Sequence, residues 1–179
     1  MELTIREFNL NDIANIVDYF LDADSDYLKG MGADKTKLPE RSVWIKNLIA
    51  EYHKPITEKT YYYIIWLVDN LPVGHSNVNN ISFGASATMH LHLWNTKQRK
   101  QGLGLHFLKL TIPQYFQQLQ LKQLICEPYS KNIAPNKTLQ KIGFKFIQTY
   151  ETIPGPISFK QKVNRYELSK QKFKLLKLK

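Results

Sequence analysis

The sequence of 179 residues contains a single cysteine, Cys126. One thiol cannot form an internal disulfide, and there is no cysteine cluster of the kind that binds zinc. No stretch approaches the run of about 18 apolar residues that a transmembrane helix needs. The first residues also lack the basic and then apolar layout of a secretory signal. These absences predict a cytoplasmic protein with no transmembrane helix and no metal site.

Arginine is also scarce, since only four of the 25 basic residues are arginines. Arginine is the residue that most often reads nucleic-acid bases through paired hydrogen bonds, so its scarcity weakens that interpretation of the net charge of +10. Residues 1–51 hold ten of the 15 acids and six of the bases, whereas residues 52–179 hold the other 19 bases. Either the lysines form a solvated surface, or an acidic region serves a cationic substrate and a basic region a phosphorylated cofactor.

No repeat or low-complexity linker divides the chain, so we predict one domain over residues 1–168 and a Lys-rich tail over 169–179. Apolar residues recur at helical spacing after residue 11, around residues 44–52, from residue 102 and over 132–142. Strand-like segments cover 3–8, 61–68, 73–81, 87–94, 121–126, 144–152 and 161–168, and the polar segment 22–39 reads as a loop or broken helix. The predicted fold class is therefore α/β, with one mixed sheet.

Residues 91–104 join an expected strand to an expected helix through a basic, glycine-bearing turn. At a helix start several backbone N–H groups are unpaired and the helix dipole favours an anion. Gly102 and Gly104 carry no side chain that would keep a phosphate away, and three bases stand beside them: Lys97, Arg99 and Lys100. The turn predicts a pyrophosphate site. It is neither a P-loop nor a Gly-x-Gly-x-x-Gly dinucleotide motif, because neither pattern is completed.

A second segment, residues 132–144, begins 28 residues after Gly104 and reads Asn-Ile-Ala-Pro-Asn-Lys-Thr-Leu-Gln-Lys-Ile-Gly-Phe. It resembles the Asn-x-Ala-x-x-x-x-Leu-x-Lys-x-Gly-Phe helix of the GNAT acetyltransferases. The pattern Arg99-x-x-Gly102-x-Gly104 resembles motif A of the same superfamily, which binds the pyrophosphate of acetyl-CoA. The resemblance covers the whole order of elements, and within the superfamily it is closest to the branch that includes ribosomal-protein N-terminal acetyltransferases.

The resemblance implies a GNAT fold: a mostly antiparallel sheet with one splayed parallel pair, flanked by helices. It implies transfer of acetyl from acetyl-CoA to a primary amine, by direct attack in a ternary complex and without a metal. The acceptor would be a protein N-terminus or a small cationic amine. The implied cofactor contacts are Leu93, Trp94, Arg99, Lys100, Gln101, Gly102, Leu103, Gly104, Asn132 and Asn136.

The implied reaction needs a base, because an alkylammonium with a pKa of about 10 must lose a proton before its nitrogen attacks the thioester. In this superfamily the base often lies on the fourth strand, where His90 and His92 share one face. Glu127, at the end of the fifth strand, is the other candidate. The structural alternatives are packed strand histidines and a solvated loop acid.

Two positions depart from the superfamily pattern. Gln140 stands where many relatives place a tyrosine that acts as the acid, and Pro113 should kink or end the helix after motif A. Four aspartates within nine residues would attract a cationic acceptor, or would only solvate a loop: Asp18, Asp22, Asp24 and Asp26. Two other functions stay open, a nucleic-acid or ribosome-binding module and a CoA-binding pseudoenzyme.

Overall fold

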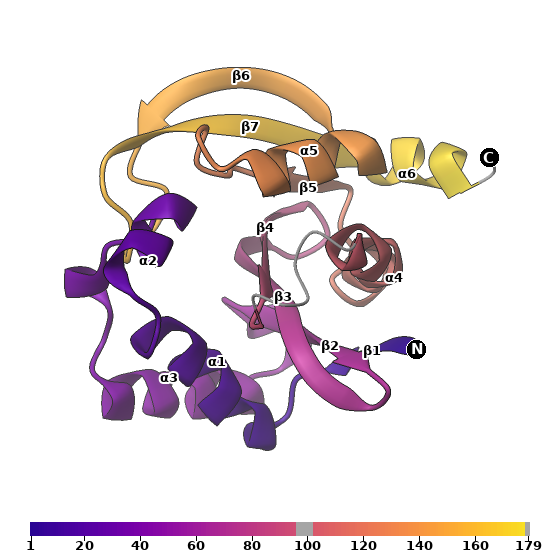
Figure 1. Cartoon of the computed structure of the whole chain (residues 1–179). Coiled ribbons are helices and arrows are strands. Elements are labelled where there is room, and N and C mark those ends of the chain that lie inside the picture. Colours follow the sequence, from indigo (N-terminus) through magenta and orange to yellow (C-terminus); the bar gives the residue numbers. More distant parts are fainter. Residues whose placement is uncertain (96–101, 178–179) are drawn as a thin grey trace.

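The computed structural model describes residues 1–95 and 102–177. Within these residues the strands form one sheet of order β1-β2-β3-β4-β5-β7-β6 (Figure 1). The strands are β1 (Leu3–Glu7), β2 (Tyr62–Val68), β3 (Leu71–Ser82), β4 (Ser86–Leu93), β5 (Gln123–Cys126), β6 (Lys145–Thr152) and β7 (Gln161–Ser169). The helices are α1 (Ile13–Leu21), α2 (Ser25–Met31), α3 (Arg41–His53), α4 (Leu103–Gln118), α5 (Ile133–Ile142) and α6 (Lys170–Lys177).

All neighbouring strands pair antiparallel except β4 and β5, which pair parallel. The parallel pair requires a crossover, and α4 supplies it between the two strands. The predicted class, a mixed α/β sheet that is mostly antiparallel and flanked by helices, is confirmed.

Strand β2 lies between two layers of helices. Ile64 and Trp66 pack in the main core with α4, α5 and α6, whereas Ile65 packs on the opposite face with α1 and α3. Figure 1 shows α4 and the pair α1 and α3 on opposite sides of the sheet. The Trp66 ring stacks on Phe107 with centroids 5.0 Å apart, and its indole N–H donates to Thr111 at 2.9 Å. Both faces of β2 are therefore covered by helices.

In three segments the structure specifies what the sequence left open. Part of the polar segment 22–39 forms α2, whose first turn is capped by the Asp24 side chain at 2.7 Å from the Tyr27 N–H. Helix α4 does not end at Pro113 but continues to Gln118. The Lys-rich residues after β7 form α6, and its buried Phe173 packs against Phe116 in the main core.

Candidate active site

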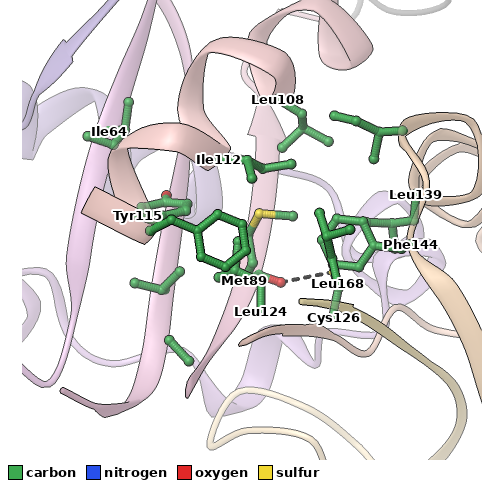
Figure 2. Packing of buried hydrophobic residues seen from close by; sticks show 14 of the residues in the cluster. Ile64, Met89, Leu108, Ile112, Tyr115, Leu124, Cys126, Leu139, Phe144 and Leu168 are labelled. Carbon is green, nitrogen blue, oxygen red and sulfur yellow. Dashed lines mark hydrogen bonds between the residues drawn. The ribbon is translucent and has the colours of Figure 1, made fainter. Parts of the chain in front are cut away.

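Strands β4 and β5 separate after a short stretch of pairing. Their parallel register covers only residues 86–88 of β4, although β4 stays paired with β3 as far as Leu93. At the point of separation the Cys126 thiol donates to the Met89 carbonyl at 3.0 Å (Figure 2). Because peptide groups alternate along a strand, that of Leu91 points to the same edge as that carbonyl. The predicted splay is present, and it exposes the edge of β4 to a ligand.

Helix α4 begins at a glycine in the left-handed region. Gly102 is the N-cap with φ 79°, a conformation that glycine adopts without strain. Leu105 and His106 donate to the Gly102 carbonyl, but no hydrogen bond within the described residues reaches the N–H of Leu103 or Gly104. A Cβ added at Gly102 or Gly104 would meet no atom of the described residues within 4 Å. Open space thus faces unpaired donors at this helix start, as an anion would require.

Three of the residues predicted to contact the cofactor, Arg99, Lys100 and Gln101, lie outside the described residues. Leu103 is buried in the main core, so only its backbone is available to a ligand. The Trp94 backbone N–H donates to the Val73 carbonyl and its indole N–H to His75 Nδ1, both at 2.9 Å. Both Trp94 donors are therefore engaged within the protein.

The two asparagines of the second motif play different parts. Asn132 is the N-cap of α5, yet its side chain makes no capping hydrogen bond and lines a cavity beside the splay. Asn136 is buried, and its amide donates to the carbonyls of Tyr129 and Asn132 and accepts from Asn164. Asn136 therefore ties the start of α5 to β7, whereas the side chain of Asn132 is turned to the cavity.

The cavity measures about 690 Å³ and extends from the splay to α1 and α3. The loop 154–158 between β6 and β7 forms part of its wall. Of the predicted site residues, it brings together His90, His92, Glu127 and Asn132. It does not reach the start of α4, Leu93, Trp94 or Asn136, and none of the four clustered aspartates lines it. The expectation that those aspartates frame the acceptor site therefore finds no support in the cavity lining.

His90 faces the cavity in its neutral form. Its Nε2 lies 3.1 Å from the Asn79 amide oxygen, which can only accept, so Nε2 carries the proton and Nδ1 is an acceptor. Burial lowers the pKa of His90 to about 4, although the nearby Glu127 carboxylate acts in the opposite direction. His90 is therefore a weak base.

The sequence reasoning missed His75, which pairs with His92 across β3 and β4. It lines the cavity, is buried, and accepts the indole N–H of Trp94. Burial lowers its pKa to about 3. The signal that could have revealed it is the polar alternation His75, Asn77, Asn79, which places all three residues on one face of β3.

The buried histidines predict a pH-dependent stability. An unfolded histidine has a pKa of about 6.5, so below that pH the unfolded chain binds protons that folded His75 and His90 do not. The free energy of unfolding should therefore fall as the pH falls from about 6.5 toward about 4. At pH 5, about 1.5 units below the unfolded pKa, each histidine should lower the free energy of unfolding by about 2 kcal/mol, because one pH unit corresponds to about 1.36 kcal/mol.

His75→Gln keeps an acceptor for Trp94 but removes one titrating group. We expect its unfolding free energy, measured with denaturant, to lose about 2 kcal/mol less than the wild type between pH 7 and pH 5. His53→Gln, at an exposed position, is the control and should leave the pH dependence as it is. Equal losses in wild type and His75→Gln would contradict this account.

Glu127 lies at the end of β5, where the strands separate, and lines the cavity. Its Oε1 accepts from Tyr150 at 2.6 Å and from Arg165 at 2.8 Å. Within the described residues no hydrogen bond reaches Oε2, so one carboxylate oxygen is held in place and the other is free to accept. Glu127 is therefore held as an oriented hydrogen-bond acceptor.

Cys126 also lines the cavity, and its thiol is buried. Burial raises the pKa of its thiol to about 12, and the S–H donates a hydrogen bond to the Met89 carbonyl. Gln140, at the position of the expected tyrosine, donates to the Tyr166 hydroxyl at 3.2 Å. Tyr129, half-buried, lines the cavity and is the tyrosine nearest to this motif in the sequence.

Within the described residues, no group of three or more His, Cys, Asp or Glu side chains is placed to hold a metal ion. The helices of this part of the chain are all too short or too polar to cross a membrane.

The comparisons with known proteins agree with this geometry. The family model for the acetyltransferase (GNAT) domain matches residues 2–145. No curated protein matches the chain in sequence.

Solved structures share the fold over almost the whole chain. A spermidine N-acetyltransferase from Vibrio cholerae, bound to CoA and spermine, matches 96% of this chain and 97% of its own, with a TM-score of 0.78 at 12% identity. A ribosomal-protein-S5-alanine acetyltransferase from Vibrio fischeri covers 97% and 96%, with a TM-score of 0.76 at 15% identity. An aminoglycoside acetyltransferase with coenzyme A covers 97% and 98%, with a TM-score of 0.73 at 14% identity. At these identities the likeness concerns the fold alone.

Proposed function

Because the chain belongs to the GNAT acetyltransferase family, we propose that it transfers acetyl from acetyl-CoA to a primary amine by direct attack in a ternary complex. The observation that carries this proposal is the continuity of the splay with the cavity: the edge of β4 opens between β4 and β5, and the cavity begins there. Amines are also the acceptors of the proteins that share the fold, namely spermidine, ribosomal-protein alanine and aminoglycosides.

The described residues fit two parts of acetyl-CoA, its pyrophosphate and its pantetheine arm. The unpaired N–H groups of Leu103 and Gly104, behind open space, would hold the pyrophosphate. The opened edge of β4 would pair with the amides of the pantetheine arm, and the free Asn132 side chain would reach them from the other side. Once bound, acetyl-CoA supplies a thioester carbonyl that an amine nitrogen can attack.

The chain must remove a proton from the acceptor. We assign this role to Glu127, whose Oε2 is unoccupied while Arg165 and Tyr150 hold Oε1. His90 is a second acceptor on the same cavity, and its neutral Nδ1 can take part through a water. Tyr129 is the candidate acid in place of the tyrosine that Gln140 replaces.

Direct attack predicts that no acetyl group is ever carried by the protein. Cys126→Ala should keep turnover within about threefold of the wild type, because the wild-type thiol is protonated and buried. The loss of a buried atom should lower the unfolding free energy by about 1 kcal/mol.

The test is steady-state release of CoA with a panel of primary amines, together with mass spectrometry of the protein during turnover. Intersecting initial-velocity lines and an unmodified protein are expected. Parallel lines, an acetylated protein, or loss of turnover in Cys126→Ala would contradict direct attack. Acetyl-CoA that is neither bound nor used with any amine would overturn the function itself.

A further inference from the structure

The far part of the cavity has a wall of aromatic rings, formed by residues of α3, α1, β4, β3 and β2 and by Tyr61, directly before β2. We call it the aromatic wall, and it comprises Trp44, Phe20, His92, His75, Tyr63 and Tyr61. Neighbouring ring centroids along this sequence are 5.3, 5.1, 4.9, 5.7 and 6.3 Å apart. All six rings line the cavity, so a ligand there would meet one continuous ring surface.

Ile16 and Leu48 extend this surface with aliphatic side chains from α1 and α3. His75 does not charge this wall near pH 7, because burial lowers its pKa to about 3, and the ring of His92 packs against the rings of Tyr19, Phe20 and His75. An apolar group placed against the ring faces of this wall would be removed from water, which favours binding.

Carboxylates are scarce along the same cavity. Among the described residues that line it, the charged side chains are Glu51, Lys54 and Glu127. Glu51 is already engaged: it accepts from Lys54 at 2.5 Å, from the Thr60 hydroxyl at 2.9 Å and from the Tyr61 N–H at 2.8 Å. That leaves the Oε2 of Glu127 as the carboxylate oxygen open to an ammonium.

A polycation should therefore bind weakly in this cavity. Its first ammonium can reach Glu127, but the next would lie against aromatic and aliphatic side chains, where an unpaired charge is costly. The acidic cluster does not help, because Asp24 caps α2, Asp18 pairs with Arg41, and neither lines the cavity.

Building on the acetyl transfer proposed above, we propose that the acceptor is a primary amine with one positive charge on an apolar, ring-sized body. The amine lies at Glu127 and the body lies on the aromatic wall. A single ammonium is also compatible with the rings, since an aromatic face attracts a cation at close range. This chemistry occurs in free arylalkylamines and in peptides whose first residue is bulky and apolar.

The test compares kcat/KM for three amines at saturating acetyl-CoA: 2-phenylethylamine, a tripeptide that begins with phenylalanine, and spermidine. At least one of the first two should exceed spermidine by about 100-fold, and the better of the two identifies the source of the amine. Spermidine used as well as the better of them, or acetyl-CoA bound with no transfer to any of the three, would overturn the inference. Use of spermidine alone would leave the proposed function standing, whereas failure to bind acetyl-CoA would overturn that function.

Two variants distinguish an effect on the aromatic wall from an effect on folding. Trp44→Ala should lower kcat/KM for the better aromatic substrate by about tenfold or more and leave the KM for acetyl-CoA unchanged, while Trp44→Phe should retain most of the activity. Asn47→Asp adds a carboxylate at an exposed position of the cavity lining, so it should fold normally and raise kcat/KM for spermidine several-fold. Equal effects of either variant on both amines would count against the aromatic wall as the acceptor site.

Discussion

Gly102→Asp should weaken the binding of acetyl-CoA by about 100-fold or more. The new carboxylate would stand in the open space before the N–H groups of Leu103 and Gly104, where we place the pyrophosphate. Two unit charges about 4 Å apart near a protein surface repel by about 4 kcal/mol, which is more than the roughly 2.7 kcal/mol of a 100-fold change. Calorimetric titration with acetyl-CoA measures the effect.

Gly84→Asp is the matched control for that variant. Gly84 also has a positive φ, 77° against 79°, and also has open space where a Cβ would lie, but it belongs to the turn between β3 and β4. Both variants therefore introduce the same charge and the same backbone strain. Gly84→Asp should bind acetyl-CoA as the wild type does, and equal weakening by both changes would refute the assignment of the pyrophosphate site.

Glu127→Gln should lower kcat by about 10²- to 10⁴-fold and leave the affinity for acetyl-CoA unchanged, because a general base of this kind contributes about that factor. The amide keeps the shape of the side chain and can still accept from Arg165, but it cannot take a proton. His90→Ala should have a smaller effect, because burial has already lowered the pKa of that imidazole to about 4.

The control for Glu127→Gln is Glu167→Gln. Glu167 also binds Arg165, at 2.8 Å from its Nε, but it does not line the cavity. A change that acts only through the arginine would appear in both variants. Comparable losses of kcat in the two variants, or no loss as large as tenfold in either Glu127→Gln or His90→Ala on a true acceptor, would remove Glu127 from the proposed role.

The parts of the site that sequence reasoning predicted are encoded locally. The glycine turn before α4 and the second-motif helix are contiguous segments, so their residues can be assigned from spacing and backbone preference. The apolar face of α1 is of the same kind, and its positions Ile13, Ile16, Val17 and Phe20 are buried as the helical period predicts.

The parts that could not be predicted depend on pairing between distant segments. His75 reaches the cavity because β3 pairs with β4 in the register that sets it opposite His92, and nothing in either strand alone specifies that register. Asn136 is turned inward because Asn164, 28 residues later, donates to it. Phe173 is buried because α6 returns to Phe116.

The acidic cluster shows a different limit. Charge density along the sequence does not indicate the direction in which a loop folds. In the structure Asp24 caps α2 and Asp18 forms an ion pair with Arg41. The cap itself has a local signal, since an aspartate directly before a helix is a preferred N-cap residue.

The most direct measurement of the central claim is the change in backbone amide NMR signals when acetyl-CoA is added to the full chain. We expect the largest changes at Leu103 and Gly104, at Leu91 on the opened edge of β4, and at the side-chain amide of Asn132. Gly84 and the exposed strand β6 should not respond. Signals that change elsewhere while these four stay unaltered would contradict binding of acetyl-CoA across the splay and the start of α4.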